Sequence, residues 1–110
     1  MDTNGYPTDE ELDTIEKWDF RKNGIEEFLS YIRDNWEYAD IGYYDLKKSE
    51  DGKIWNLELH TGGWSGNECM IDSINNNFVF WAITWRKSEL GGHYYFEIKP
   101  ELFKNEKGVK

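Results

Sequence analysis

The sequence predicts an α+β domain, a four-stranded and mainly antiparallel sheet with helices packed on it, in the order α-α-β-β-α-β-β. Three observations lead to this expectation. Apolar residues recur with the helical period of about 3.6 before residue 40. From Ile41 the period falls to two, as in a half-buried strand. Two corners, Gly62-Gly63 and Gly91-Gly92, are each followed closely by an aromatic residue and separate the later elements.

Two helices are expected in the first 40 residues, because a start signal precedes each apolar stripe. Thr8 with Glu11 makes a capping box, and the first helix should run to about Trp18. Asn23 is the expected cap of the second helix. The apolar stripe of the second helix consists of Ile25, Phe28, Leu29, Ile32 and Trp36.

A β-hairpin is expected around Asp51-Gly52, which suits a two-residue type I′ turn. One face of this hairpin is apolar and pairs Lys48 with Trp55, Leu46 with Leu57 and Tyr44 with Leu59. The other face is polar and pairs Lys47 with Asn56, Asp45 with Glu58 and Tyr43 with His60. A shift by one residue would mix the two faces, so the turn and the pattern support the same register.

The third helix is expected to follow Trp64. Ser65 and Glu68 read as its capping box, with Cys69 packed beneath Trp64. One side of this helix presents Met70, Ile71, Ile74 and finally Phe78. Asn75-Asn76-Asn77 ends it, because Asn tolerates a left-handed conformation.

The segment 78–85 is apolar on both alternations and predicts a central strand, covered on at least part of both faces. A helix over the same segment stays open, because short apolar runs suit either structure. A turn at 88–92 then leads to a last strand at 93–98, which Pro100 stops. At 110 residues the chain fits a single domain, with flexible tails expected at 1–5 and 105–110.

Negative charge is concentrated near the N-terminus. Residues 1–40 hold twelve acids and four bases, which is −8 of a net charge of −9. Such a field repels nucleic acid and attracts basic protein surfaces. Acidic helices also keep a small protein soluble, which is the plainer interpretation. A single cysteine, no signal-peptide pattern and no apolar run long enough to span a membrane favour a cytoplasmic protein.

A glycine-rich loop precedes the third helix, and such loops can bind a phosphate. Gly62, Gly63 and Trp64 form this loop, which lacks the Lys of a Walker loop. The loop serves either a sharp turn beneath Trp64 or a small, nucleotide-like ligand stacked on that indole. In the second interpretation, the residues that line the pocket with the glycines and Trp64 are His60, His93 and Tyr95.

The two histidines approach each other if the two hairpins meet edge to edge. Their expected neighbours are Glu58, Glu97, Tyr43 and Tyr95. Such a cluster suits zinc binding or acid–base chemistry, and a weaker alternative is a hydrolase that uses His60, His93 and Glu68. No HExxH or CxxC spacing is present, so the sequence predicts no metal and no cofactor.

Four segments, PTDEELDTIEKWD, TGGWSGNE, FWAITW and GGHYYFEI, together resemble small proteins encoded by phages and prophages. The resemblance covers about residues 6–98 and is most specific in TGGWSGNE and GGHYYF. It brings no activity, catalytic residue or cofactor. It implies a protein made in a bacterial cytoplasm from mobile DNA.

These observations favour a non-enzymatic phage accessory protein that binds a basic host or phage protein through an acidic helical face. Inhibition of a nucleic-acid-directed host defence is one role of this kind. The alternative is the small-ligand binder with the Gly-Gly-Trp loop. Neither direct contact with nucleic acid nor a membrane is expected. The predicted partner-binding acids are Asp9, Glu10, Asp13, Glu16, Glu26, Glu27, Asp34 and Glu37.

Overall fold

The computed structural model describes residues 6–36 and 42–103. The predicted tails at 1–5 and 105–110, and the acid Glu37, lie outside the described residues. The helices are α1 (Asp9–Glu16), α2 (Ile25–Asp34), α3 (Ser65–Asn76), α4 (Phe78–Thr84) and a short 3-10 helix, η1 (Pro100–Phe103). The strands are β1 (Tyr43–Lys48), β2 (Trp55–His60), β3 (Trp85–Glu89) and β4 (His93–Ile98).

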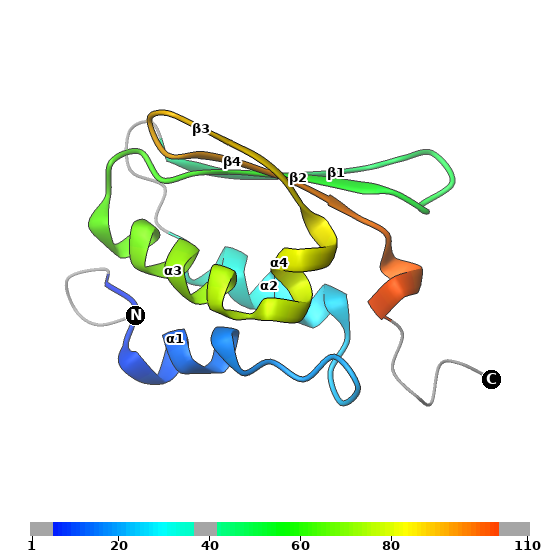
Figure 1. The fold of residues 1–110 in the computed structure, drawn as a ribbon, viewed down its shortest axis with the longest axis horizontal. Coiled ribbons are helices and arrows are strands. Elements are labelled where there is room, and N and C mark those ends of the chain that lie inside the picture. Colours follow the sequence, from blue (N-terminus) through cyan, green and yellow to red (C-terminus); the bar gives the residue numbers. More distant parts are fainter. Residues whose placement is uncertain (1–5, 37–41, 104–110) are drawn as a thin grey trace.

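The strands form one antiparallel sheet in the order β1-β2-β4-β3. Figure 1 shows the helices on one side of this sheet, with the other face left open. The helices α2, α3 and α4 lie next to the sheet, and α1 lies beyond α3, farthest from the strands (Figure 1). The predicted α+β fold class, with helices packed on a four-stranded antiparallel sheet, is therefore confirmed.

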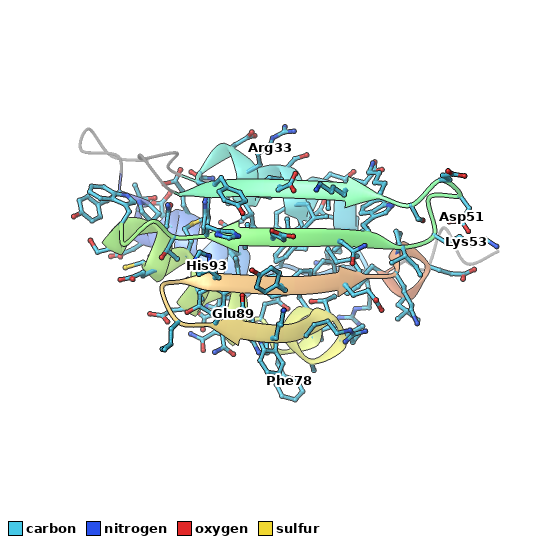
Figure 2. All side chains as sticks on the ribbon, turned by 90° about the horizontal axis from the view of Figure 1, so that it is seen from above. Arg33, Asp51, Lys53, Phe78, Glu89 and His93 are labelled. Atoms are coloured by element: carbon cyan, nitrogen blue, oxygen red, sulfur yellow. The ribbon has the colours of Figure 1, made fainter. Side chains whose placement is uncertain are left out.

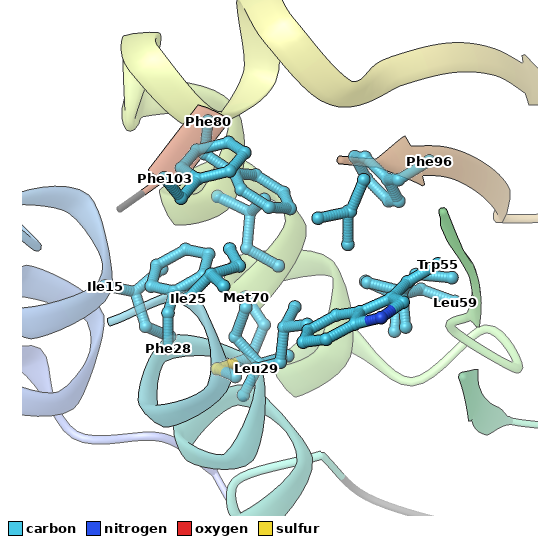
Figure 3. Close-up of a cluster of buried hydrophobic side chains, with 14 of the residues drawn as sticks. Ile15, Ile25, Phe28, Leu29, Trp55, Leu59, Met70, Phe80, Phe96 and Phe103 are labelled. Atoms are coloured by element: carbon cyan, nitrogen blue, oxygen red, sulfur yellow. The ribbon is translucent and has the colours of Figure 1, made fainter. Parts of the chain in front are cut away.

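The hydrophobic core lies between the sheet and the helices (Figure 3). Each layer contributes large side chains that are buried completely or nearly so. The helices supply Ile15, Ile25, Phe28, Leu29, Ile32, Met70, Ile74 and Phe80, and the strands supply Trp55, Leu57, Leu59, Phe96 and Ile98. Burial of each such side chain stabilises the fold by about 1.5–3 kcal/mol relative to exposure. The predicted stripe of α2 is thus a core face, and Phe103 from η1 joins the same core through contacts with Phe20 and Phe80.

The first capping box is confirmed, and the second helix start is displaced by one residue. Thr8 Oγ1 accepts a hydrogen bond from the Glu11 N–H at 3.2 Å, and the Thr8 N–H donates to the Glu11 carboxylate at 2.8 Å. At α2 the cap is Gly24 instead of Asn23, and its N–H donates to the Glu27 carboxylate at 2.6 Å. The helix α1 ends at Glu16, before the expected end near Trp18, and the Trp18 indole N–H donates to the Asn23 carbonyl at 3.2 Å.

The predicted register of the first hairpin is confirmed at all six pairs from Tyr43–His60 to Lys48–Trp55. The predicted type I′ turn is wrong, because that turn needs positive φ at both central residues and only Gly52 has it, at 71°. The Gly52 N–H donates to the Ser49 carbonyl at 2.9 Å, and the Asp51 carboxylate accepts from the Lys53 N–H at 3.0 Å. The register therefore follows from the two faces of the strands and not from the turn type.

The start of α3 differs from the expected capping box. Trp64 occupies the cap position without a side-chain hydrogen bond, and Ser65 Oγ bonds to the Tyr6 hydroxyl at 3.1 Å. The Trp64 ring packs against Tyr6, with centroids 4.7 Å apart. Because Trp64 turns toward Tyr6, it does not cover Cys69, which is exposed.

The predicted central strand at 78–85 is wrong, because the structure forms α4 over most of this segment. Asn77 ends α3 with a φ of −78°, so the left-handed stop expected there is also wrong. Its side chain instead begins the next helix, since Oδ1 accepts from the Phe80 N–H at 3.3 Å. Its Nδ2 donates to the Ile15 carbonyl at 2.9 Å, which ties the α3–α4 junction to α1. This buried amide decides between helix and strand where the apolar pattern does not.

The consequence is that the third strand is short and lies at an edge. Only Trp85–Glu89 is extended, and every residue of β3 is exposed. Within α4, Phe80 and Thr84 are buried one turn apart, whereas Phe78 is 80% exposed. Phe78 therefore does not extend the buried side of α3, contrary to the sequence-based expectation.

Candidate functional site

The two Gly-Gly corners meet at one end of the sheet. The Thr61 N–H, just before the first corner, donates to the carbonyl of Gly92 in the second corner at 3.0 Å. Gly92 has a φ of 80°, and a Cβ there would overlap the Thr61 hydroxyl. Only glycine combines that backbone conformation with such a close approach, so this contact fixes how β2 and β4 meet.

His60 and His93 lie directly opposite each other, because this contact sets the register of β2 and β4. Hydrogen-bonded and non-hydrogen-bonded pairs alternate along antiparallel strands. Since Thr61 bonds to Gly92, the His60–His93 pair is of the non-hydrogen-bonded kind, in which side chains come closest. Nδ1 of His93 contacts Nδ1 of His60, and the ring centroids are 4.2 Å apart. One Nδ1 must donate the shared proton and the other must accept it.

Tyr43 and Glu58 enclose His60 from the other side. The Tyr43 ring stacks on the imidazole with centroids 3.8 Å apart, and the side chain of His60 is only 8% exposed. A Glu58 carboxylate oxygen lies 3.5 Å from His60 Nε2 and accepts from the Tyr43 hydroxyl at 3.5 Å. Burial lowers the pKa of His60, the charge of His93 lowers it further, and Glu58 opposes both. His60 is therefore held neutral down to a lower pH than an ordinary histidine.

Tyr95 and Glu89 continue this surface toward β3. The Tyr95 hydroxyl donates to the Glu89 carboxylate, which lowers the pKa of Glu89 and raises the pKa of Tyr95. Lys87 Nζ lies 4.6 Å from the centre of the Tyr95 ring and 3.7 Å from Glu89. Figure 2 shows Glu89 and His93 on neighbouring strands of the open face. We define the histidine corner as Tyr43, Glu58, His60, Glu89, His93 and Tyr95.

Glu89 was not among the predicted site residues, because 88–92 was expected to be a turn. The observation that reveals it is the β3–β4 register, which pairs Glu89 with His93. Glu97, expected near the histidines, instead pairs with Asn56 across the sheet and accepts from Arg86 at 3.1 Å.

The remaining predicted ligand residues do not join the histidine corner. Trp64 packs on Tyr6, and Gly62 and Gly63 form the turn with φ of 63° and 75°. Glu68, named for the hydrolase alternative, is exposed on the first turn of α3. A groove of about 710 Å³ lies between the start of α2, the β1–β2 turn and η1, and a groove of about 500 Å³ lies between α1 and α4. None of the predicted ligand residues lines either groove.

The acids predicted on α1 share one side of that helix. Successive residues of a helix turn by about 100°, so Asp9, Glu10, Asp13 and Glu16 fall within an arc of about 120°. All four are exposed, and the buried Ile15 lies outside that arc. Asp13 pairs with Lys17 at 3.0 Å. Among the described residues, Asp9, Glu10 and Glu16 form no ion pair.

The acids predicted on α2 are also exposed, but each has a partner. Glu26 lies 3.8 Å from Lys48 Nζ, and Asp34 lies 3.6 Å from Arg33. Glu27 accepts the hydrogen bond from the Gly24 N–H that caps the helix. Of the partner-binding acids predicted on these two helices, those without an ion pair or a capping hydrogen bond among the described residues therefore lie on α1. We define the α1 face as Asp9, Glu10, Asp13 and Glu16.

Within residues 6–36 and 42–103, no group of three or more His, Cys, Asp or Glu side chains is placed to hold a metal ion. None of the helices in that part of the chain is both long and apolar enough for a membrane crossing. No protein-family model matches the chain, and comparison with curated proteins and with solved structures likewise finds no match.

Proposed function

We propose that this protein is a non-enzymatic binding protein whose α1 face, assisted by the acids of α2, recognises a basic surface on another protein. The observation that carries the proposal is the arrangement of α1. Three of its four exposed acids are free of ion pairs among the described residues, and all four share one arc of the helix. Unpaired charges of one sign accelerate and orient association with the opposite sign.

The chemistry of the partner follows from this arrangement. Carboxylates along one helix side present a row of negative charge, as the phosphates of a nucleic acid do. A protein groove lined by Lys or Arg for phosphates is therefore the surface that we expect α1 to occupy. With the phage resemblance, this supports a role as inhibitor of a nucleic-acid-directed host protein.

The test is capture from a bacterial lysate on the immobilised protein at about 50 mM and about 500 mM salt, because screening weakens exposed ion pairs. The binding variant carries Asp9→Lys, Glu10→Lys and Glu16→Lys. We expect specific captured proteins to have basic surfaces, to elute at the higher salt and to be lost with this variant.

The matched control reverses three other exposed acids, Glu50→Lys, Asp72→Lys and Glu101→Lys, in the β1–β2 turn, α3 and η1. It changes the net charge by the same amount, so it separates the α1 face from overall charge. Equal loss of capture in both variants, or capture that resists both salt and α1 reversal, would reject the proposal.

A second candidate function is small-ligand binding at the histidine corner. It is favoured by the meeting of the two Gly-Gly corners, which places His93 and Tyr95, both half-buried, beside the buried His60. Imidazole and phenol groups of this kind hydrogen-bond to a polar ligand and stack on its rings. A nucleotide, which offers a ring for stacking and polar groups for hydrogen bonding, is the ligand class that we expect at these side chains.

This candidate is tested by thermal unfolding with a panel of nucleotides, because a ligand that binds the folded state raises the melting temperature. We expect a shift that His93→Ala removes and that Trp64→Ala retains, since Trp64 packs away on Tyr6. If no nucleotide shifts the transition, the ligand interpretation loses its support while the α1 proposal stands.

A further inference from the structure

Within residues 6–36 and 42–103, no strand pairs with the outer side of the β3 backbone. The strand β3 is the last strand in the order β1-β2-β4-β3, and its five residues are all exposed. On its inner side Lys87 lies opposite Tyr95, and Glu89 lies opposite His93. An exposed strand edge of this kind is a template for pairing with another strand.

The hydrogen-bond alternation shows which residue of β3 faces outward. The Thr61 N–H donates to the Gly92 carbonyl, so the backbone N–H and C=O of Tyr94, two residues on, also point toward β2. The backbone N–H and C=O groups of His93 and Tyr95 then point the other way, toward β3. Lys87 and Glu89, opposite these two residues, therefore direct their backbone groups to β4. Ser88 lies between them and directs its N–H and C=O to the free edge.

We infer that this edge joins a second copy of the same chain, so that two β3 strands pair antiparallel about a two-fold axis at Ser88. Ser88 then lies opposite Ser88 of the other copy, and the backbone N–H of each donates to the backbone C=O of the other. Lys87 lies opposite Glu89 of the other copy, and Glu89 opposite Lys87. Two-fold pairing thus generates two oppositely charged cross-strand pairs, which stabilise a sheet, on the open face where both side chains already lie.

Exposed apolar side chains on α4 and at the start of β3, which we call the apolar flank, also favour a second copy at this edge. The helix α4 leaves Phe78 80% exposed, Val79 53% and Ile83 36%, and Trp85 at the start of β3 is 39% exposed. Figure 2 shows Phe78 projecting on the side of the molecule that β3 borders. Exposed apolar groups gathered at one place mark interaction surfaces. In the two-fold arrangement the flanks of the two copies lie side by side beneath the joined sheet.

The other edge strand provides an internal comparison. In β1, Asp45 and Lys47 have the same two-residue spacing and lie 3.6 Å apart. Tyr44 and Leu46, on the inner face of β1, pack against the core instead of standing exposed. The charges of the two edges are thus alike, and the exposed flank of α4 distinguishes β3. A bulge between Trp85 and Lys87 limits the matched segment to Lys87–Glu89, so we expect a weak, concentration-dependent dimer.

The test is sedimentation velocity on the full chain between about 10 µM and about 1 mM, the range suited to a weak interface. We expect the wild-type protein to pass from monomer to dimer. Lys87→Glu places like charges opposite each other twice and should weaken association about tenfold or more. The double variant Lys87→Glu with Glu89→Lys restores both pairs and should restore the dimer. Lys47→Glu, on β1, should leave association unchanged.

Circular dichroism checks that each variant folds. If Lys87→Glu does not fold, Phe78→Ser replaces it, because a side chain that is 80% exposed is removed with little effect on the core. A protein that stays monomeric over the whole range, a dimer weakened equally by Lys47→Glu, or a double variant that stays monomeric would each overturn the inference. The dimer can fail without the proposed function failing, because its decisive variants change Lys87 and Glu89 on β3 and leave every acid of α1 in place, although Phe78 and Val79 share the α1–α4 groove with Glu16.

Discussion

The α1 face and the histidine corner are two polar surfaces of opposite construction. On α1 the acids stand in solvent, and only Asp13 has an ion-pair partner among the described residues. At the corner the side chains contact one another in a row from Tyr43 through His60 to His93. The α1 face thus carries carboxylates that mostly lack an ion-pair partner, whereas both carboxylates of the corner, Glu58 and Glu89, contact neighbouring side chains.

This difference separates stability from recognition. Exposed charges contribute little to folding, yet they act over a distance of about 8–10 Å in physiological salt. Packed and hydrogen-bonded groups contribute to folding, because their removal leaves voids or unsatisfied partners. We therefore expect substitutions at the corner to change stability, and substitutions on α1 to change binding.

The largest stability effect is expected at the contact between the two corners. In Gly92→Ala the added Cβ would overlap the Thr61 hydroxyl, and alanine would have to adopt a φ of 80°. The substitution should therefore lower the free energy of unfolding by about 3 kcal/mol. Gly63→Ala is the matched control, because its φ is 75° and the space around it is open. It should cost only about 1 kcal/mol. Equal losses in urea unfolding would show that backbone strain alone matters and that the corners do not press together.

A pH dependence of stability is expected from His60. Burial and His93 lower its pKa in the folded protein, so the unfolded chain takes up the proton more readily. The stability that neutral His60 gives the folded protein is therefore fully present above the pKa of a histidine in the unfolded chain, about 6.5. It declines as the pH falls below that value. Urea unfolding between about pH 7.5 and pH 5 should show the decline in the wild type and a smaller one in His60→Gln. An unchanged slope in the variant would contradict this assignment.

A smaller effect is expected at the cap of α1. Thr8→Ala removes the oxygen that accepts the Glu11 N–H, and it should cost about 1 kcal/mol. Thr8→Ser keeps that oxygen and should cost much less. If both variants unfold with the same midpoint in urea, the capping box does not anchor the start of the helix.

The smallest effect on stability is expected from the acids themselves. Asp9→Asn, Glu10→Gln and Glu16→Gln together should change the unfolding free energy by less than about 0.5 kcal/mol. The lost attraction between Asp9, Glu10 and the helix N-terminus is offset by relief of repulsion in a chain of net charge −9. A loss of several kcal/mol in the same urea assay would show that the α1 face is structural, and the contrast with the corner would disappear.

The parts of the fold that were predictable from sequence are those in which the local pattern has one solution. The first hairpin is one of them, since alternate residues sort cleanly into an apolar and a polar face. The segment 78–84 has no such solution, because it is apolar at both the helical and the strand period. There the outcome depends on Asn77, whose side chain reaches the Ile15 carbonyl 62 positions away in sequence.

The candidate sites likewise divide into features that a local sequence pattern determines and features that depend on tertiary contacts. The exposure of the α1 acids was predictable, because their spacing places them opposite the buried Ile15. The approach of His60 and His93 was predictable only on the condition that the hairpins meet. That condition is satisfied by the close contact of Gly92 with Thr61, a tertiary contact that no local pattern contains. Glu89 was missed because the extent of β3 depends on where α4 ends.

The most direct test of the central claim is NMR chemical-shift mapping of the isotope-labelled protein with a basic protein captured from the lysate. If the α1 face makes the contact, the largest shifts will fall on amides 9–16, with smaller shifts on 26–34, and raised salt will reverse them together. Shifts confined to residues 58–61 and 89–95, with α1 unchanged, would contradict the account and assign recognition to the histidine corner.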